Sequence, residues 1–249
     1  MFRKCTRYFN PRRLIFLPPI YLTPFIISKM NYHTLTFYSD GFAPVFPLLI
    51  LLLKRDISMV GKSSVIGFLI TAMVGFTTAD FLGGTTGNNL YVYNLLPVLF
   101  SIPLFLFFRK VLNDNYTSRM NVYAFIGLAI FYSSGYKTVF DNQYFNTSFY
   151  IAFSINFCFS CFLFYAEQLI EVGENRIWKS NGFWFVTCLL FYTGTSTIIW
   201  LLLKPVMDKA VKYNLSNVEI NYPGDLWKLH HLVFWISCII LAVALLRKK

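Results

Sequence analysis

The polar side chains that could do chemistry gather at the ends of long apolar segments. Asp80 is the acidic residue that we place near the end of such a segment rather than in a loop, and Thr77 and Thr78 precede it. Asn94 lies one segment later, at a similar depth. Burying a carboxylate in lipid is costly unless it faces protein or water. Asp80 and Asn94 are therefore the first candidates for a binding role.

The other candidates flank the same turns between segments. They offer amide, phenol, amine, carboxylate, indole and imidazole groups, which could hydrogen-bond a small ligand or a lipid headgroup in an outward-facing polar vestibule. They are Asn89, Tyr91, Lys137, Asp141, Asn146, Tyr150, Trp227, His230 and His231. The alternative is interfacial anchoring, because Tyr and Trp prefer the headgroup zone and Asn and Asp cap helix ends.

Two patterns resemble metal or redox sites. His230 and His231 lie near an aspartate, but adjacent residues of a helix point about 100° apart, so both imidazoles cannot comfortably face one ion. Cys158 and Cys161 have C-x-x-C spacing within an apolar segment, with no second pair to complete a zinc site. Small residues at this spacing pack helices together. We expect a hydrogen-bonded histidine, no metal, no cofactor and no catalytic signature.

Seven apolar segments can position these groups. Each is about long enough to cross a hydrocarbon core of about 30 Å. The chain is 56% hydrophobic and 13% charged, whereas a soluble domain carries about 25% charged residues. The segments are 37–53, 63–82, 89–108, 122–140, 147–170, 183–203 and 226–246. The sequence therefore predicts an all-α, polytopic membrane helix bundle of about seven transmembrane helices.

The basic residues indicate the orientation of the bundle. Most Lys and Arg lie at alternate segment ends, whereas the opposite ends hold only Lys137, Lys204, Lys209, Lys212 and Lys228. The richer set is Lys54, Arg55, Lys62, Arg109, Lys110, Arg119, Arg176, Lys179, Arg247, Lys248 and Lys249. Because cytoplasmic loops carry the excess of Lys and Arg, we expect a cytoplasmic C-terminus. These Lys and Arg residues at the helix ends account for the net charge of +11, so we expect no nucleic-acid partner.

Three of the segments share a pattern. Phe76, Tyr132 and Tyr192 each stand just before a hydroxyl residue, in the second, fourth and sixth segments. We interpret the chain as one leading helix followed by three helical hairpins, since membrane folds are often built from repeats. The alternative is that aromatic–hydroxyl pairs recur by chance in a chain that is 20% aromatic.

The first 36 residues form a separate part of the predicted organisation. Residues 1–36 are a basic N-terminal arm and residues 37–249 the transmembrane domain. The arm carries Pro18, Pro19 and Pro24 within its apolar stretch, and proline breaks helices. We favour an interfacial segment or a misassigned start, with translation from Met30, over an eighth, broken span.

Part of the chain resembles a known group of proteins. The runs NLYVYN at 89–94, FWFVTCLLFYTG at 183–194 and LWKLH at 226–230 are similar to those of small bacterial seven-helix membrane proteins of uncharacterised function. The resemblance covers roughly 37–249. It implies a fold and a bacterial inner (plasma) membrane location rather than an activity.

The leading functional hypothesis is a sensor or accessory protein. Its outward-facing pocket would take a small ligand or lipid, and its loops 54–62, 109–119 and 167–180 would contact a cytoplasmic or membrane signalling partner. The second hypothesis is a membrane-embedded enzyme acting on lipid, with Asp80 and His230 or His231 as acid and base. The third is a transporter, which would need a polar path through the midplane.

Overall fold

The computed structural model describes residues 40–54, 56–86, 89–136, 145–171, 179–213 and 221–247. They all belong to one compact unit, Thr36–Lys249. The N-terminal arm 1–36, Lys137 and Asp141 lie outside the described residues. The predictions made for them, including translation from Met30, stay predictions.

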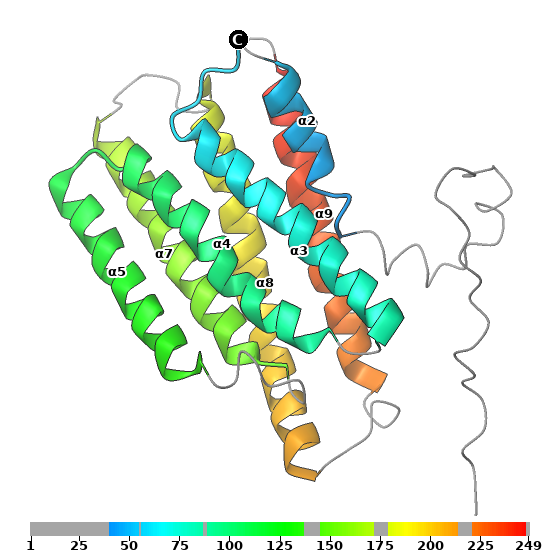
Figure 1. Cartoon of the computed structure of the whole chain (residues 1–249). Helices are drawn as coiled ribbons and strands as arrows, with labels where there is room; N and C mark the ends of the chain where they lie inside the picture. The colour runs from blue at the N-terminus through cyan, green and yellow to red at the C-terminus, as the bar shows by residue number, and fades with distance from the viewer. Residues whose placement is uncertain are drawn as a thin grey trace, which may run out of the picture. The chain divides into compact units, whose positions relative to one another are not determined.

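Throughout this part of the chain the secondary structure is helical. Seven α-helices are present and no strand occurs among the described residues. They are α2 (Val45–Leu53), α3 (Lys62–Thr86), α4 (Leu90–Val111), α5 (Asn115–Ser134), α7 (Thr147–Glu171), α8 (Asn181–Tyr213) and α9 (Asn221–Leu246) (Figure 1). The prediction of an all-α bundle is confirmed, and the number of helices in this part equals the number of predicted segments.

Five of these helices are long and apolar enough to cross a membrane. The qualifying stretches are Lys62–Gly83, Leu90–Val111, Thr147–Ile170, Asn181–Val206 and Leu226–Leu246. Apolar side chains also cover their outer faces, where Ile198, Leu232 and Ile239 are exposed. Helices that are apolar on every face are typical of a membrane span or a buried core. The chain is thus a membrane-embedded, multi-pass bundle.

The other two helices differ from their predicted segments. Among the described residues of segment 37–53, only Val45–Leu53 is helical, and nine residues at 1.5 Å each reach about 14 Å, less than half a hydrocarbon core. Helix α5 begins at Asn115 rather than 122. Its earlier start has a local cause, because the Asp114 carboxylate accepts hydrogen bonds from the backbone N–H groups of Tyr116 and Thr117, at 2.9 and 3.0 Å.

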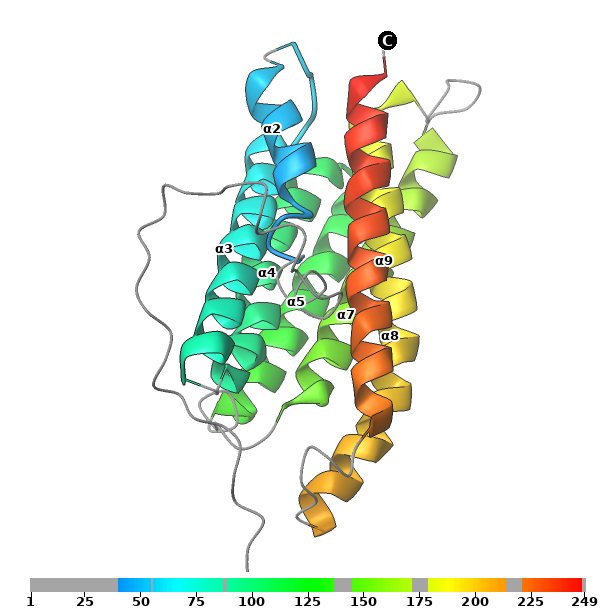
Figure 2. The same ribbon diagram turned by 90° about the vertical axis from the view of Figure 1, so that its right-hand side faces the viewer.

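Six helices close into a ring. Around it, α2 packs against α3, α3 against α4, α4 against α7, α7 against α8, α8 against α9, and α9 against α2. Helix α5 lies outside the ring, against α4 and α7 (Figures 1 and 2). The predicted hairpin pairs α3–α4, α5–α7 and α8–α9 are all in contact.

The interior of the ring is rich in phenylalanine. Phe100 lies 5.5 Å from Phe68, 5.8 Å from Phe76 and 6.1 Å from Phe153, measured between ring centroids. Tilted and edge-to-face pairs of this kind stabilise a core beyond the area they bury. Cys161 is buried beside the Val186 carbonyl, and Cys158 donates to Thr193 Oγ1 at 3.2 Å. The C-x-x-C pair therefore packs α7 against α8, as its spacing predicts.

The two ends of the bundle differ in chemistry. Lys54, Lys62, Lys110 and Arg247 lie at one end, here called the basic end, where α3, α5 and α8 begin (Figure 1). Helices α4, α7 and α9 begin at the opposite end, here called the polar end. At the basic end the Glu167 carboxylate of α7 accepts from the backbone N–H groups of Asn113 and Asp114 and from the Thr117 hydroxyl. Glu167 thus fixes the turn between α4 and α5.

Candidate functional site

Asp80 lies near the polar end of α3 and is 4% exposed. The Tyr93 hydroxyl of α4 donates to Asp80 Oδ1 at 3.4 Å, the long limit for a hydrogen bond. One turn away, Asn89 Nδ2 donates to the Ala79 carbonyl at 3.0 Å. The sequence predicted that Asp80 is the acid that matters here, and it is indeed buried rather than solvated.

Asp40 is a second buried carboxylate, which the sequence analysis missed. It lies in the turn before α2, is 2% exposed, and its Oδ2 contacts His231 Nδ1 of α9. Its Oδ1 has no hydrogen-bond partner in the part of the chain that the structure describes. The turn approaches α3 closely, because a Cβ on Gly41 would lie only 2.3 Å from Thr77 Oγ1. The available signal was an acidic residue followed by glycine inside the apolar segment 37–53.

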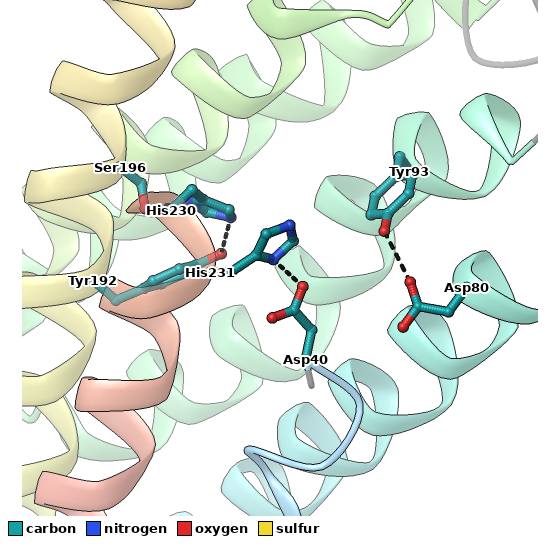
Figure 3. Close-up of polar contacts among 7 residues, drawn as sticks. All are labelled: Asp40, Asp80, Tyr93, Tyr192, Ser196, His230 and His231. Atoms are coloured by element: carbon teal, nitrogen blue, oxygen red, sulfur yellow. Dashed lines mark hydrogen bonds and ion pairs between the residues drawn. The ribbon is translucent and has the colours of Figure 1, made fainter. Parts of the chain in front are cut away.

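His230 and His231 face different partners. His230 is 2% exposed, with Nδ1 3.1 Å from Ser196 Oγ and Nε2 3.4 Å from the Tyr192 hydroxyl, both on α8. Figure 3 shows His231 turned instead toward Asp40. The sequence argument that adjacent imidazoles do not share a target agrees with this geometry. Ser196 was not anticipated, and Tyr192 was noted only as part of the repeat.

These side chains form the polar cluster, defined as Asp40, Asp80, Tyr93, Tyr192, Ser196, His230 and His231 (Figure 3). It draws on α3, α4, α8, α9 and the turn before α2. Among the described residues, no three His, Cys, Asp or Glu side chains gather as metal ligands. The cluster instead offers hydrogen-bond donors and acceptors and two carboxylates.

An aromatic group surrounds the cluster, consisting of Tyr93, Phe145, Tyr150, Trp200 and Trp227. The Trp227 ring lies 5.0 Å from Tyr93, 5.0 Å from Phe145 and 5.6 Å from Trp200, centroid to centroid. The Trp200 ring lies 4.5 Å from His230, and its Nε1 is buried without a partner. An indole N–H usually finds an acceptor when buried. Trp227 was predicted as a site residue, whereas Trp200 was not.

Three further predicted residues link α4 to the start of α7. Asn94 is fully buried, and its Oδ1 accepts from the Asn146 backbone N–H at 2.8 Å. The Tyr150 hydroxyl donates to the Tyr93 carbonyl at 2.8 Å. Tyr91 is half-buried and packs against the core. These contacts position Tyr93 beside Asp80.

A cavity lies deeper in the ring than the polar cluster. Its volume is about 20 Å³, roughly the space for one water molecule. Side chains of α3, α8 and α9 line it, among them Phe68, Cys188, Tyr192, Phe234 and Cys238. Tyr192 is the residue that belongs to both the cavity and the polar cluster. Four candidates for the expected vestibule, Asp80, Asn94, Tyr150 and His230, are buried.

Comparison with protein-family models, curated proteins and solved structures finds no match for this chain. The resemblance to small bacterial seven-helix membrane proteins therefore stays a prediction. Any function has to be argued from the geometry of the polar cluster.

Proposed function

We propose that the protein is a membrane-embedded sensor or accessory protein that binds a small ligand or lipid headgroup at the polar cluster. The observation that carries the proposal is the burial of Asp40 and Asp80, with one Asp40 oxygen lacking a partner. A buried polar atom without a partner costs about 1–3 kcal/mol, and more for a charged group. Intramembrane carboxylates of this kind mark functional sites.

The exposure of the predicted residues favours binding over interfacial anchoring. Anchoring residues reach the headgroup zone with their polar atoms. Asn94 and His230 are instead buried inside the ring, and Tyr150 is buried with its hydroxyl on a backbone carbonyl. Their polar atoms are directed at one another and at neighbouring helices.

The signalling part of the proposal concerns the basic end. We place the protein in a bacterial inner (plasma) membrane, with Arg247 on the cytoplasmic side and the polar cluster toward the outside, on the charge distribution and the resemblance. The partner contacts are the loops at the basic end. Arg247 lies over the Trp184 ring, 4.4 Å from its centroid, which anchors the end of α9 on the start of α8. Several helices run from the polar cluster to the basic end. A change in helix packing caused by ligand binding at the cluster could therefore reach the partner.

A second candidate is an enzyme acting on lipid. The contact between Asp40 and His231 favours it, because a carboxylate orients an imidazole that acts as a general base. In this candidate the carboxylate that works with the histidine is Asp40, whereas the hypothesis from the sequence named Asp80. Turnover of a lipid extract by the purified protein, lost in His231→Ala, would select this candidate over the sensor.

The test of the sensor proposal separates function from folding. Asp80→Asn, Asn94→Ala and His230→Ala are introduced into cells in which loss of the gene changes growth or gene expression. Asp208→Asn is the matched control, because Asp208 is exposed and, among the described residues, pairs with Lys204. We expect Asp80→Asn to accumulate at the normal level, and Asn94→Ala and His230→Ala to accumulate at reduced but detectable levels because each removes a buried hydrogen-bond partner. None of the three should restore the phenotype. Full restoration by all three would refute the proposal.

A further inference from the structure

We infer that the polar cluster takes an organic cation, a substituted ammonium group, between the Asp40 carboxylate and the Trp227 ring. The inference rests on the proposed function and names the ligand class for the same site. It depends on three features of the cluster: an unpartnered carboxyl oxygen, a nearby indole ring, and the His231 imidazole that contacts the carboxyl group and lies beside the indole.

The site holds two buried carboxyl groups, those of Asp40 and Asp80. Asp40 Oδ1 has no hydrogen-bond partner, although the residue is 2% exposed. In the described part of the chain, neither Asp40 nor Asp80 forms an ion pair with Lys or Arg. A buried carboxylate needs a counter-charge or donors to offset its desolvation. A cation that brings a positive charge and fits in an apolar surround meets this need.

The aromatic group supplies the second half of the recognition. Cations bind over Trp and Tyr faces within about 6 Å of the ring centroid, and quaternary ammonium ligands are recognised in aromatic cages by this interaction. Trp227 lies 5.0 Å from Tyr93 and 5.3 Å from the His231 ring. The Trp227 and Tyr93 rings thus lie close to the place where His231 contacts the Asp40 carboxylate.

His231 marks the position of the cation. Its imidazole touches Asp40, and the centroid of its ring lies 5.3 Å from that of Trp227. Figure 3 shows His231 reaching toward Asp40 from α9. A ligand cation that replaces this imidazole would keep both contacts. The turn that carries Asp40 reaches the outer surface within two residues, because Phe42 is exposed. Entry of a small headgroup at this place requires a shift of the turn.

The same ammonium chemistry occurs in soluble amines and in lipid headgroups, so the test has two arms. The first measures by calorimetry the binding of choline chloride and of its uncharged isostere 3,3-dimethyl-1-butanol to the full chain in detergent. The second compares thermal unfolding in nanodiscs of phosphatidylcholine with that in nanodiscs of phosphatidylglycerol. Both arms include Asp40→Asn, with Asp208→Asn as the matched control.

We expect choline to bind about tenfold more tightly than its isostere, or phosphatidylcholine to stabilise the protein selectively, and Asp40→Asn to remove that preference. The arm that shows the preference identifies the source. If Asp40→Asn does not fold, Trp227→Phe replaces it, with a binding loss of about threefold or more expected. The inference of a cation is overturned if charge selectivity is absent in both arms. It is also overturned if charge selectivity persists in a folded Asp40→Asn variant. Equal binding of both probes together with equal stability in the two lipids would remove this inference and leave the proposed function standing.

Discussion

Replacing Asp80 by asparagine is expected to stabilise the protein while abolishing its function. The carboxylate is 4% exposed, and its described hydrogen bond comes from Tyr93 at 3.4 Å. A bond this long contributes at most about 1 kcal/mol, whereas an undercompensated buried charge costs about 1–3 kcal/mol or more. Asparagine keeps the shape and an acceptor oxygen and removes the charge. The balance is a gain of about 1 kcal/mol in the free energy of unfolding.

The assay is thermal unfolding of the purified protein in one detergent. A gain of about 1 kcal/mol corresponds to a rise in Tm of about 2–4 °C for a chain of this size. Asp208→Asn, in an exposed pair, is expected to leave Tm unchanged. Tyr93→Phe removes the hydroxyl alone and should change stability by less than about 1 kcal/mol. A fall in Tm for Asp80→Asn would show that the carboxylate is a structural link, and the functional reading of Asp80 would fail.

Three further predictions concern packing and hydrogen bonding. Glu167→Ala should lower the free energy of unfolding by about 2–4 kcal/mol, because two backbone N–H groups and a hydroxyl lose their acceptor; an unchanged chemical-denaturation midpoint would contradict this. Gly75→Ala should destabilise by about 1–3 kcal/mol, since its Cβ would lie 2.2 Å from Leu96 Cδ2, while the control Gly127→Ala meets open space and should raise Tm slightly. His230→Phe should cost about 1–3 kcal/mol by stripping two buried hydroxyls of their partner, and equal Tm values for variant and wild type would count against this role.

The sequence alone determined the class of fold. Segments of apolar residues long enough to cross a bilayer predict helices because no water is available there to satisfy a free backbone. This argument located the membrane-crossing stretches of α3, α4, α7, α8 and α9 within a few residues, although α8 itself continues to Tyr213, beyond its predicted end at 203. It also explained Cys158 and Cys161, since their spacing places both on one helix face, where they meet α8. The sequence identified Asp80 and Asn94 as candidates because placing a polar side chain within an apolar segment costs free energy.

Tertiary structure alone decided how those polar groups are combined. Asp40 meets His231, and His230 meets Ser196 and Tyr192, through the packing of helices that are distant in sequence. The short α2 and the outer position of α5 likewise depend on which neighbours cover each helix. Hydropathy measures the transfer of one segment from water into lipid. It contains no information about which other segment will pack against that segment. Residue types could therefore identify costly polar side chains, but only the closed ring of helices fixed which of them lie together.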